Sequence, residues 1–296
     1  MGNDRSLLAY HVVDVFASQR FAGNPLAVVL DADELTGDQM QQLASEFHLS
    51  ETAFPLTPSR EQTADGADYA LRIFTPEVEI PFAGHPSIGT AWLLRQLGRL
   101  TADEVRQSCG EGLLPITVST DAATLTGGEP RVGEPIDPTP VTAAVGLSAQ
   151  DVVGEVRIAS TGLGYAVLPV KPQALDRCRP DMTLLKSYFS YPGEATGVYV
   201  VAWDGDVRQV QARMFAGDVG VPEDPATGSA ALALGAYLAA SGEFGDGTQH
   251  VNITQGVSMG RPSSLHIEVA VEQGKATRVR VTGAVVRVAE GRIHAP

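Results

Sequence analysis

Glu51, His85 and Asp224 are the residues whose types and surroundings best suit acid–base chemistry. Glu51 stands in HLSETAFP, at the start of an apolar stretch in which an acid has no packing role. A carboxylate that is partly desolvated at the mouth of a strand has a raised pKa and can serve as a general base. A solvated loop glutamate is the alternative interpretation of a single acid in this setting.

His85 and Asp224 occupy the same position in two similar motifs, HPSIGTA at 85–91 and DPATGSA at 224–230. A histidine can carry a proton near neutral pH, and an aspartate can orient that histidine or a substrate amine. His85 taken alone is more typical of a structural hydrogen bond. Their matched positions favour a shared site.

Each of the two motifs predicts a tight turn that leads into a helix. Glycine allows close backbone approach, and Pro, Ser or Thr suits the first helical turn. The free N–H groups and the positive end of the helix dipole make such a start an anion site. We therefore expect the two helix starts together to hold a small carboxylate without Arg or Lys, the alternative being two tight connections without a ligand.

Further short matches indicate that the chain consists of two similar halves. The offset of 139 residues that relates the two motifs also relates LAVV at 26–29 to YAVL at 165–168, and RIF at 72–74 matches RMF at 213–215 at an offset of 141. Ordered matches near half the chain length are typical of an internal repeat. At the first offset Glu51 falls on Ser190, so we expect one acid–base residue rather than a symmetric pair.

The elements that must position these residues are mostly strands, with three punctuated helices. Runs rich in β-branched and aromatic residues predict strands at 8–18, 26–31, 68–74, 165–170, 196–203 and 207–215, and hairpins over 265–293. Thr36 and Gln39 form a capping-box pattern ahead of a helix that ends near His48. Two more helices are expected from 86 to 97 and from 227 to 242, and the proline-rich stretch 128–140 is predicted to be a linker.

Composition limits the class of protein and its partners. The chain has 296 residues, 44% of them hydrophobic, which predicts about two globular domain units. The net charge of −14 argues against nucleic acid and membrane surfaces as partners. The first 20 residues lack the pattern of a signal peptide, and no window is apolar enough to span a bilayer, so we expect a cytoplasmic protein.

Thiol and metal chemistry have little support in the sequence. The two cysteines, Cys109 and Cys178, form no C-x-x-C pair and lie away from the predicted helix starts, which indicates a reducing compartment and no thiolate catalyst. The six histidines are scattered without a metal-binding spacing, so no metal site is expected.

Five ordered motifs carry a resemblance to a known family: DVFASQRFAGNPLAVVL, MQQLASEFHLSETAF, FAGHPSIGTA, EDPATGSAA and QGVSMGRPS. Together they resemble the phenazine-biosynthesis PhzF-like family of the diaminopimelate-epimerase-like superfamily, over residues 8 to 290. The resemblance implies an α+β fold of two similar, pseudo-symmetric domains, each a β-barrel-like sheet around a central helix, with the active site between them. The domains expected are 1–130 and 131–296, with the last strand returning to the first domain.

The resemblance also implies a chemistry and a set of site residues. In the family's isomerase members the glutamate of the S-E-T motif, here Glu51, moves a proton on a cyclic amino-acid substrate without a cofactor. The other substrate contacts carried over by the motifs fall on His85, Asp224, Ser229, the backbone of Gly84 and Gly228, and Asn24 in FAGNP. Arg261 in GRPS matches the family pattern and receives no catalytic role. A small anionic substrate and a homodimer are implied as partners.

Related epimerases and racemases use a pair of cysteines, one at each helix start. This chain has His85 and Ser229 near those positions, which favours proton transfer by one base over stereoinversion by two thiols. An amino-acid epimerase with a non-thiol base, and a binding protein of the same fold without turnover, remain the alternatives.

Overall fold

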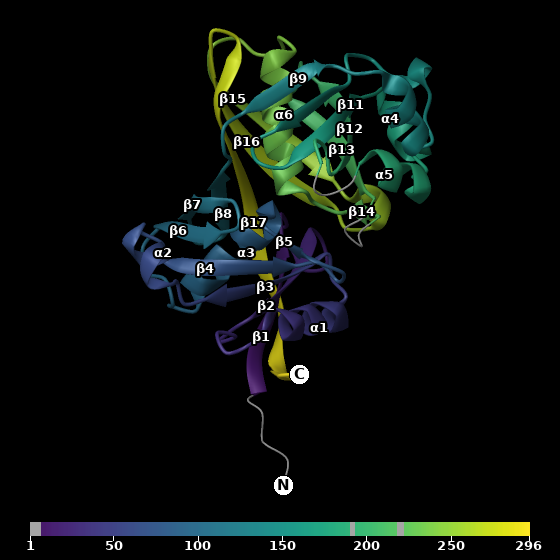
Figure 1. Ribbon diagram of the computed structural model, residues 1–296. Helices are drawn as coiled ribbons and strands as arrows, with labels where there is room; N and C mark the ends of the chain where they lie inside the picture. The colour runs from purple at the N-terminus through teal and green to yellow at the C-terminus, as the bar shows by residue number, and fades with distance from the viewer. Residues whose placement is uncertain (1–6, 190–192, 218–221) are drawn as a thin grey trace. The chain divides into compact units, whose positions relative to one another are not determined.

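The computed structural model describes residues 7–189, 193–217 and 222–296, and the chain divides into two compact units. Unit 1 consists of Met1–Leu125 together with Ala284–Pro296, and unit 2 consists of Thr126–Gly283. Each unit is described by itself below, with the labels of Figure 1.

Unit 1 is a barrel of eight strands with one helix inside it. Its elements are β1 (Leu7–Val15), β2 (Asn24–Val29), α1 (Gly37–Phe47), β3 (Glu51–Leu56), α2 (Arg60–Ala64), β4 (Tyr69–Phe74), β5 (Glu79–Ile80), α3 (Gly84–Gln96), β6 (Glu104–Cys109), β7 (Gly112–Val118), β8 (Ala122–Thr126) and the end of β17 (Lys275–His294). The strand order is β17-β1-β2-β3-β4-β6-β7-β8, and β8 also pairs with β17. The pairs β2–β3 and β4–β6 are parallel.

Unit 2 repeats this strand order, but within its described residues the two end strands do not pair with each other. Its elements are β9 (Arg131–Pro135), α4 (Pro138–Ala144), η1 (Ala149–Asp151), β10 (Arg157–Ser160), β11 (Gly164–Pro169), η2 (Pro172–Arg177), α5 (Met182–Tyr188), β12 (Gly197–Asp204), β13 (Gln209–Ala216), β14 (Glu223–Asp224), α6 (Gly228–Ala240), β15 (Gly247–Gln255), η3 (Val257–Met259), β16 (Ser263–Glu272) and the start of β17. The order β9-β10-β11-β12-β13-β15-β16-β17 again has two parallel pairs, β11–β12 and β13–β15. The α+β fold of two similar barrel-like halves is therefore confirmed.

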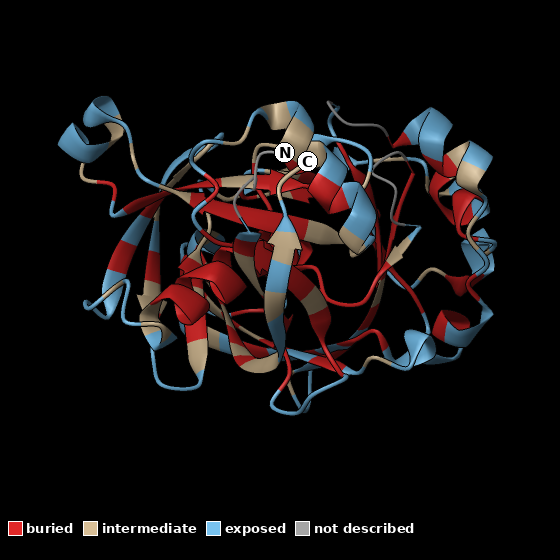
Figure 2. Cartoon of the chain, turned by 90° about the horizontal axis from the view of Figure 1, so that it is seen from below, coloured by how far each residue is buried: buried red, intermediate tan, exposed pale blue. Residues whose placement is uncertain are grey.

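The central helix of each unit is buried nearly all round. Helix α3 packs against β1, β2, β3, β6 and β7, and α6 packs against β9, β10, β11 and β16. All residues of α6 except the last are buried, as are Gly84–Leu94 in α3, because each helix is surrounded by its own sheet. In Figure 2 buried residues run along these helices and the strands, whereas the connecting loops are mostly exposed.

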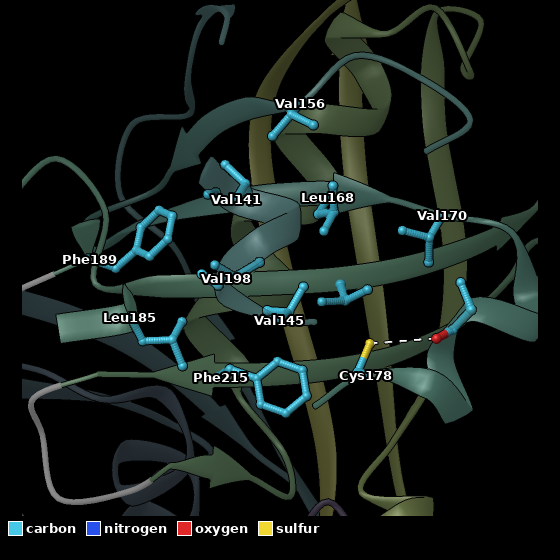
Figure 3. Packing of buried hydrophobic residues seen from close by; sticks show 14 of the residues in the cluster. Val141, Val145, Val156, Leu168, Val170, Cys178, Leu185, Phe189, Val198 and Phe215 are labelled. Carbon is cyan, nitrogen blue, oxygen red and sulfur yellow. Dashed lines mark hydrogen bonds between the residues drawn. The ribbon is translucent and has the colours of Figure 1, made fainter. Parts of the chain in front are cut away.

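A second layer of helices covers the outer face of part of each sheet. In unit 1, Met40 and Leu43 of α1 pack against Phe54 and Phe74. In unit 2, α4 and α5 cover β11, β12 and β13 through the cluster shown in Figure 3. Strands that are covered on both faces read as nearly continuous apolar runs, which explains LAVV and YAVL in the sequence.

Most predicted elements are present, and one prediction is wrong. The capping box of Thr36 and Gln39 is formed at the start of α1. The stretch 128–140 is not a linker, because 131–135 form β9, which pairs with β10, and α4 begins at Pro138. Pro135 is tolerated there because β9 is the end strand of its sheet. No helix within the described residues is long and apolar enough to cross a membrane.

Candidate active site

Adjacent strand starts in unit 1 bring Asn24 and Glu51 together. They are the first residues of β2 and β3, which run parallel with Leu26 paired to Glu51. Phe54 packs outward against α1, so strand alternation turns Glu51 inward, toward the central helix. His85 is the second residue of that helix. Two parallel strands and one helix therefore begin at the same group of side chains.

The three side chains are in contact and largely withdrawn from water. His85 Nδ1 lies 3.2 Å from Asn24 Nδ2 and 3.4 Å from Glu51 Oε2. Asn24 is 0% exposed, His85 is 3% exposed and the Glu51 side chain is 15% exposed. An amide nitrogen can only donate, so in this arrangement His85 accepts at Nδ1 and carries its single proton on Nε2.

His85 is neutral at ordinary pH. Burial lowers its pKa from 6.5 to about 3. The contact with Glu51 is therefore one between a carboxyl group and a neutral ring, although its length would fit an ion pair. His85 Nε2 is buried and makes no hydrogen bond within the described residues. The site thus has a neutral histidine that faces the Glu51 carboxyl group with Nδ1 and carries its N–H on the other ring nitrogen.

Unit 2 has no side chain at the place of Glu51. Ala27 pairs with Thr52 and Ala166 pairs with Val198, so the register makes Gly197 the structural counterpart of Glu51. A Cβ atom on Gly197 would lie 2.4 Å from the backbone oxygen of Phe215. No amino acid but glycine fits there without a shift of the backbone. Ser190, the counterpart expected from the sequence offset, lies outside the described residues.

Asp224 belongs to β14, which pairs with β13, and precedes α6 by four residues. It is 8% exposed, and Thr227 Oγ1 donates a hydrogen bond of 2.6 Å to its Oδ2. The helix starts therefore differ between the units, because α3 begins at Gly84, before His85, whereas α6 begins at Gly228, after Asp224.

Ser229, in the first turn of α6, is tied to the neighbouring sheet. Its hydroxyl lies 2.6 Å from the hydroxyl of Tyr165, and both residues are buried. Among the described residues, the N-cap residues of α3 and α6, Ala83 and Thr227, make no side-chain cap hydrogen bond. The first N–H groups of a helix have no partner within the helix, and here they belong to turns that begin with the buried Gly84 and Gly228.

Several polar residues around the start of α6 were not predicted. Tyr165, Thr227, Tyr199 and Gln255 all lie in the buried hydrogen-bond network around Asp224 and Ser229. Two of them had a signal in the sequence, since Thr227 lies within EDPATGSAA and Gln255 begins QGVSMGRPS. Arg261 of the latter motif donates its backbone N–H to the carbonyl of Gly256, and Ser263 donates its hydroxyl to the carbonyl of Arg261.

The thiols lie in other parts of the units. Cys109 ends β6, and Cys178 lies in the core under α4 and α5, where its thiol contacts the carbonyl of Ala174 at 3.7 Å (Figure 3). Burial raises the pKa of both, that of Cys178 to about 11. Within the described part of the chain, no group of three or more His, Cys, Asp or Glu side chains could hold a metal ion.

Solved structures with this architecture define the class of fold. A phenazine biosynthesis protein of the PhzF family from Bacillus anthracis superposes with a TM-score of 0.85 at 25% identity, over 97% of this chain and 99% of that one. A hydroxyproline epimerase from Agrobacterium vitis shares the fold at 17% identity, with a TM-score of 0.68 over 99% of this chain and 94% of that one.

Sequence comparison places the chain within that class. The family model for phenazine biosynthesis-like proteins matches residues 13–291. A trans-2,3-dihydro-3-hydroxyanthranilate isomerase from Pseudomonas aeruginosa is 33% identical, over 96% of this chain and 99% of that protein. An uncharacterized isomerase from Mesorhizobium japonicum is 34% identical, over 96% and 98% of the two chains. The chain belongs to the phenazine biosynthesis-like protein family.

Proposed function

We propose that this chain is a cofactor-independent isomerase that moves a proton on a small, carboxylate-bearing, amino-acid-like substrate, with Glu51 as the acid–base residue. Relatives that cover nearly the whole chain are named isomerases, which supports this class of reaction. The observation that carries the proposal is the buried contact of Glu51, His85 and Asn24 at the start of two parallel strands.

Glu51 removes a proton from a carbon that a neighbouring carbonyl or conjugated system makes acidic, and returns it to another carbon of the same substrate. The charge that develops is stabilised by the backbone N–H groups at Gly84 and Gly228. His85 donates from Nε2 to a substrate oxygen and does not act as an imidazolium, because burial holds its pKa at about 3. Asp224 orients a substrate amine, and Ser229 binds a substrate oxygen.

One acid–base residue, Glu51, suits proton transfer better than stereoinversion. Inversion by two bases needs one on each face of the carbon, and the counterpart of Glu51 is Gly197, where a side chain would meet backbone. The high pKa of the buried Cys178 thiol also argues against thiolate catalysis. An epimerase that uses a non-thiol partner is therefore the second candidate, and a silent binding protein is the third.

The first experiment uses trans-2,3-dihydro-3-hydroxyanthranilate, the compound in the names of several relatives. Nuclear magnetic resonance would follow the conversion of this compound by the wild-type protein, by Glu51→Gln, and by the matched control Glu46→Gln on the exposed face of α1. We expect wild type and the control to form a positional isomer and Glu51→Gln to form none. Product that differs only in configuration would establish the epimerase, and binding without turnover of this and other cyclic amino acids would establish the binding protein.

Three further expectations belong to the same proposal. The substrate is anionic and held by helix starts, although the net charge of the chain is −14. The protein acts in the cytoplasm, which two free cysteines support. It forms a homodimer, which light scattering coupled to gel filtration would reveal as twice the chain mass of 31.1 kDa.

A further inference from the structure

A chain of buried hydrogen bonds in unit 2 ends on the carboxylate of Asp224. Gln255, the last residue of β15, lies at its centre and is 0% exposed. Gln255 Nε2 donates to the backbone carbonyl of Asp224 at 2.8 Å. Only the amide nitrogen can donate to a carbonyl, so this contact fixes which end of the Gln255 amide is which.

With the amide fixed, the other bonds of the chain have a set direction. The hydroxyl of Tyr199 donates to Gln255 Oε1 at 3.1 Å, and burial raises the pKa of Tyr199 so that it stays a donor. Gln255 Nε2 also donates to Thr227 Oγ1 at 3.1 Å. Because the Thr227 oxygen accepts this bond, its own hydrogen is free to point at Asp224 Oδ2, 2.6 Å away.

Unit 1 contains a comparable chain with a different end. Tyr69 donates to Gln107 Oε1 at 3.0 Å, and Gln107 Nε2 donates to the hydroxyl of Ser87 at 2.9 Å. Ser87 then donates to the backbone carbonyl of Ala83 at 2.9 Å. The hydrogen bonds of a tyrosine–glutamine pair at a helix start can thus end on a backbone carbonyl, without a carboxylate. In unit 2 the last hydroxyl is directed at a carboxylate instead.

The residue after Gln255 packs directly onto the turn that carries Asp224. Gly256 has a φ of +75°, and a Cβ there would lie 2.6 Å from the carbonyl oxygen of Pro225 and 2.4 Å from that of Arg261. The motif QGVSMGRPS therefore contacts the DPATGS turn through backbone as well as through the Gln255 side chain. This close contact sets the distance between the amide and Asp224.

We infer that Gln255 and Thr227 are positioning residues that hold Asp224 as an oriented, hydrogen-bond-accepting carboxylate for its substrate amine, with Tyr199 fixing the amide of Gln255. The inference rests on the proposed role of Asp224. A carboxylate accepts strong hydrogen bonds from a cationic amine, and the Thr227 hydroxyl fixes the orientation of Asp224 through its Oδ2 atom.

The first test compares turnover of trans-2,3-dihydro-3-hydroxyanthranilate by Thr227→Val, Thr227→Ser and the matched control Thr254→Val, an exposed position on β15. Loss of a hydrogen bond to a charged group predicts a fall of about 10- to 100-fold in kcat/KM for Thr227→Val. Thr227→Ser should recover most of this loss, and Thr254→Val should match wild type. In an Asp224→Asn background, Thr227→Val should add no further loss, because Thr227 acts through Asp224.

The second test needs no substrate. Carbon-13 resonance of labelled aspartate carboxyl groups gives the titration midpoint of Asp224, identified by its absence in Asp224→Asn. We expect the midpoint to rise in Thr227→Val and to rise less in Tyr199→Phe, because the hydroxyl hydrogen bond to Oδ2 favours the ionised form. Melting temperatures of all variants report whether unit 2 still folds.

The outcomes separate this inference from the proposed function. Full activity of Asp224→Asn would overturn the role of Asp224 and leave the second test to decide on the network. Loss of activity in Asp224→Asn, together with wild-type activity and an unchanged midpoint in folded Thr227→Val, would overturn the positioning role alone. Additive losses in the double variant would overturn it as well.

Discussion

The buried neutral histidine of unit 1 predicts a specific dependence of stability on pH. The pKa of His85 is lowered from 6.5 to about 3 by burial, so between these values the unfolded chain binds a proton that the folded chain does not. Stability is therefore fully present above pH 6.5 and is lost as the pH falls toward 3. Replacing His85 with glutamine should remove this contribution to the pH dependence of the free energy of unfolding.

The size of the effect follows from the displacement of the pKa. Each unit of pH within the window corresponds to about 1.4 kcal/mol, so the full displacement from 6.5 to about 3 amounts to about 5 kcal/mol. Between pH 8 and pH 5, where the carboxyl groups of the protein still titrate little, about 2 kcal/mol of this should be lost. His85 is 3% exposed, so solvent screening reduces the value little.

Urea unfolding at pH 8, 7, 6 and 5 would measure the effect for wild type, His85→Gln and His294→Gln. The last variant removes an exposed histidine near the end of β17 and controls for the change of residue type. Between pH 8 and pH 5, we expect the free energy of unfolding to fall by about 2 kcal/mol less in His85→Gln than in wild type. An equal loss in wild type and His85→Gln would refute the assignment of a neutral, buried His85.

Three further predictions concern unit 2. Gly197→Ala should destabilise the protein by about 2 kcal/mol, measured by urea unfolding, because its Cβ would lie 2.4 Å from the backbone oxygen of Phe215. Arg213→Leu should cost about 3 kcal/mol in the same assay, because Arg213 makes two hydrogen bonds of 2.8 Å to Glu223, whose side chain is only 18% exposed. Cys178 should react with a disulfide reagent at pH 8 only as fast as the protein unfolds, because burial raises its pKa to about 11.

Matched variants control these experiments. Gly133→Ala places a Cβ 3.5 Å from the nearest backbone atom and should unfold as wild type does. Arg131→Leu breaks a solvent-exposed pair and should leave the unfolding midpoint unchanged. Cys109 is half-buried and should react before Cys178. A control variant that loses more stability than the variant it is matched with would contradict the corresponding prediction, and so would a Cys178 that reacts before Cys109.

The repeat was predictable because apolar strands around a buried helix constrain the sequence closely. LAVV and YAVL occupy β2 and β11, and the two Gly-rich motifs lie at the helix starts, where few residue types fit. The proline-rich stretch was misjudged as a linker because proline also occurs at the end strand of a sheet. Composition alone does not distinguish these two settings.

A constant sequence offset does not identify the counterpart of Glu51 in unit 2. The offset of 139 holds from Ala27 to Ala166, but the next strand is displaced by 146, from Thr52 to Val198. The connection between the two strands is longer in unit 2, and surface connections tolerate such changes. Strand register therefore identified Gly197, and with it the physical reason why Glu51 has no acidic counterpart in unit 2.

The state of His85 and the network at Asp224 also depend on three-dimensional contacts. The residue type gives histidine a pKa near neutrality, and only its complete burial lowers that value. Gln255 reaches Asp224 across 31 positions of sequence, and Tyr199 reaches Gln255 across 56. Periodicity predicts which face of an element is buried, but it does not pair polar side chains on distant strands.

Exchange of substrate hydrogen with solvent tests the central claim most directly. Wild-type protein incubated in deuterium oxide with trans-2,3-dihydro-3-hydroxyanthranilate should place deuterium on the carbon of the product that receives the proton, as mass spectrometry and magnetic resonance would detect. Glu51→Gln should bind the compound with similar affinity and exchange no hydrogen, because the amide cannot accept the proton. Exchange by Glu51→Gln at the wild-type rate would contradict the account.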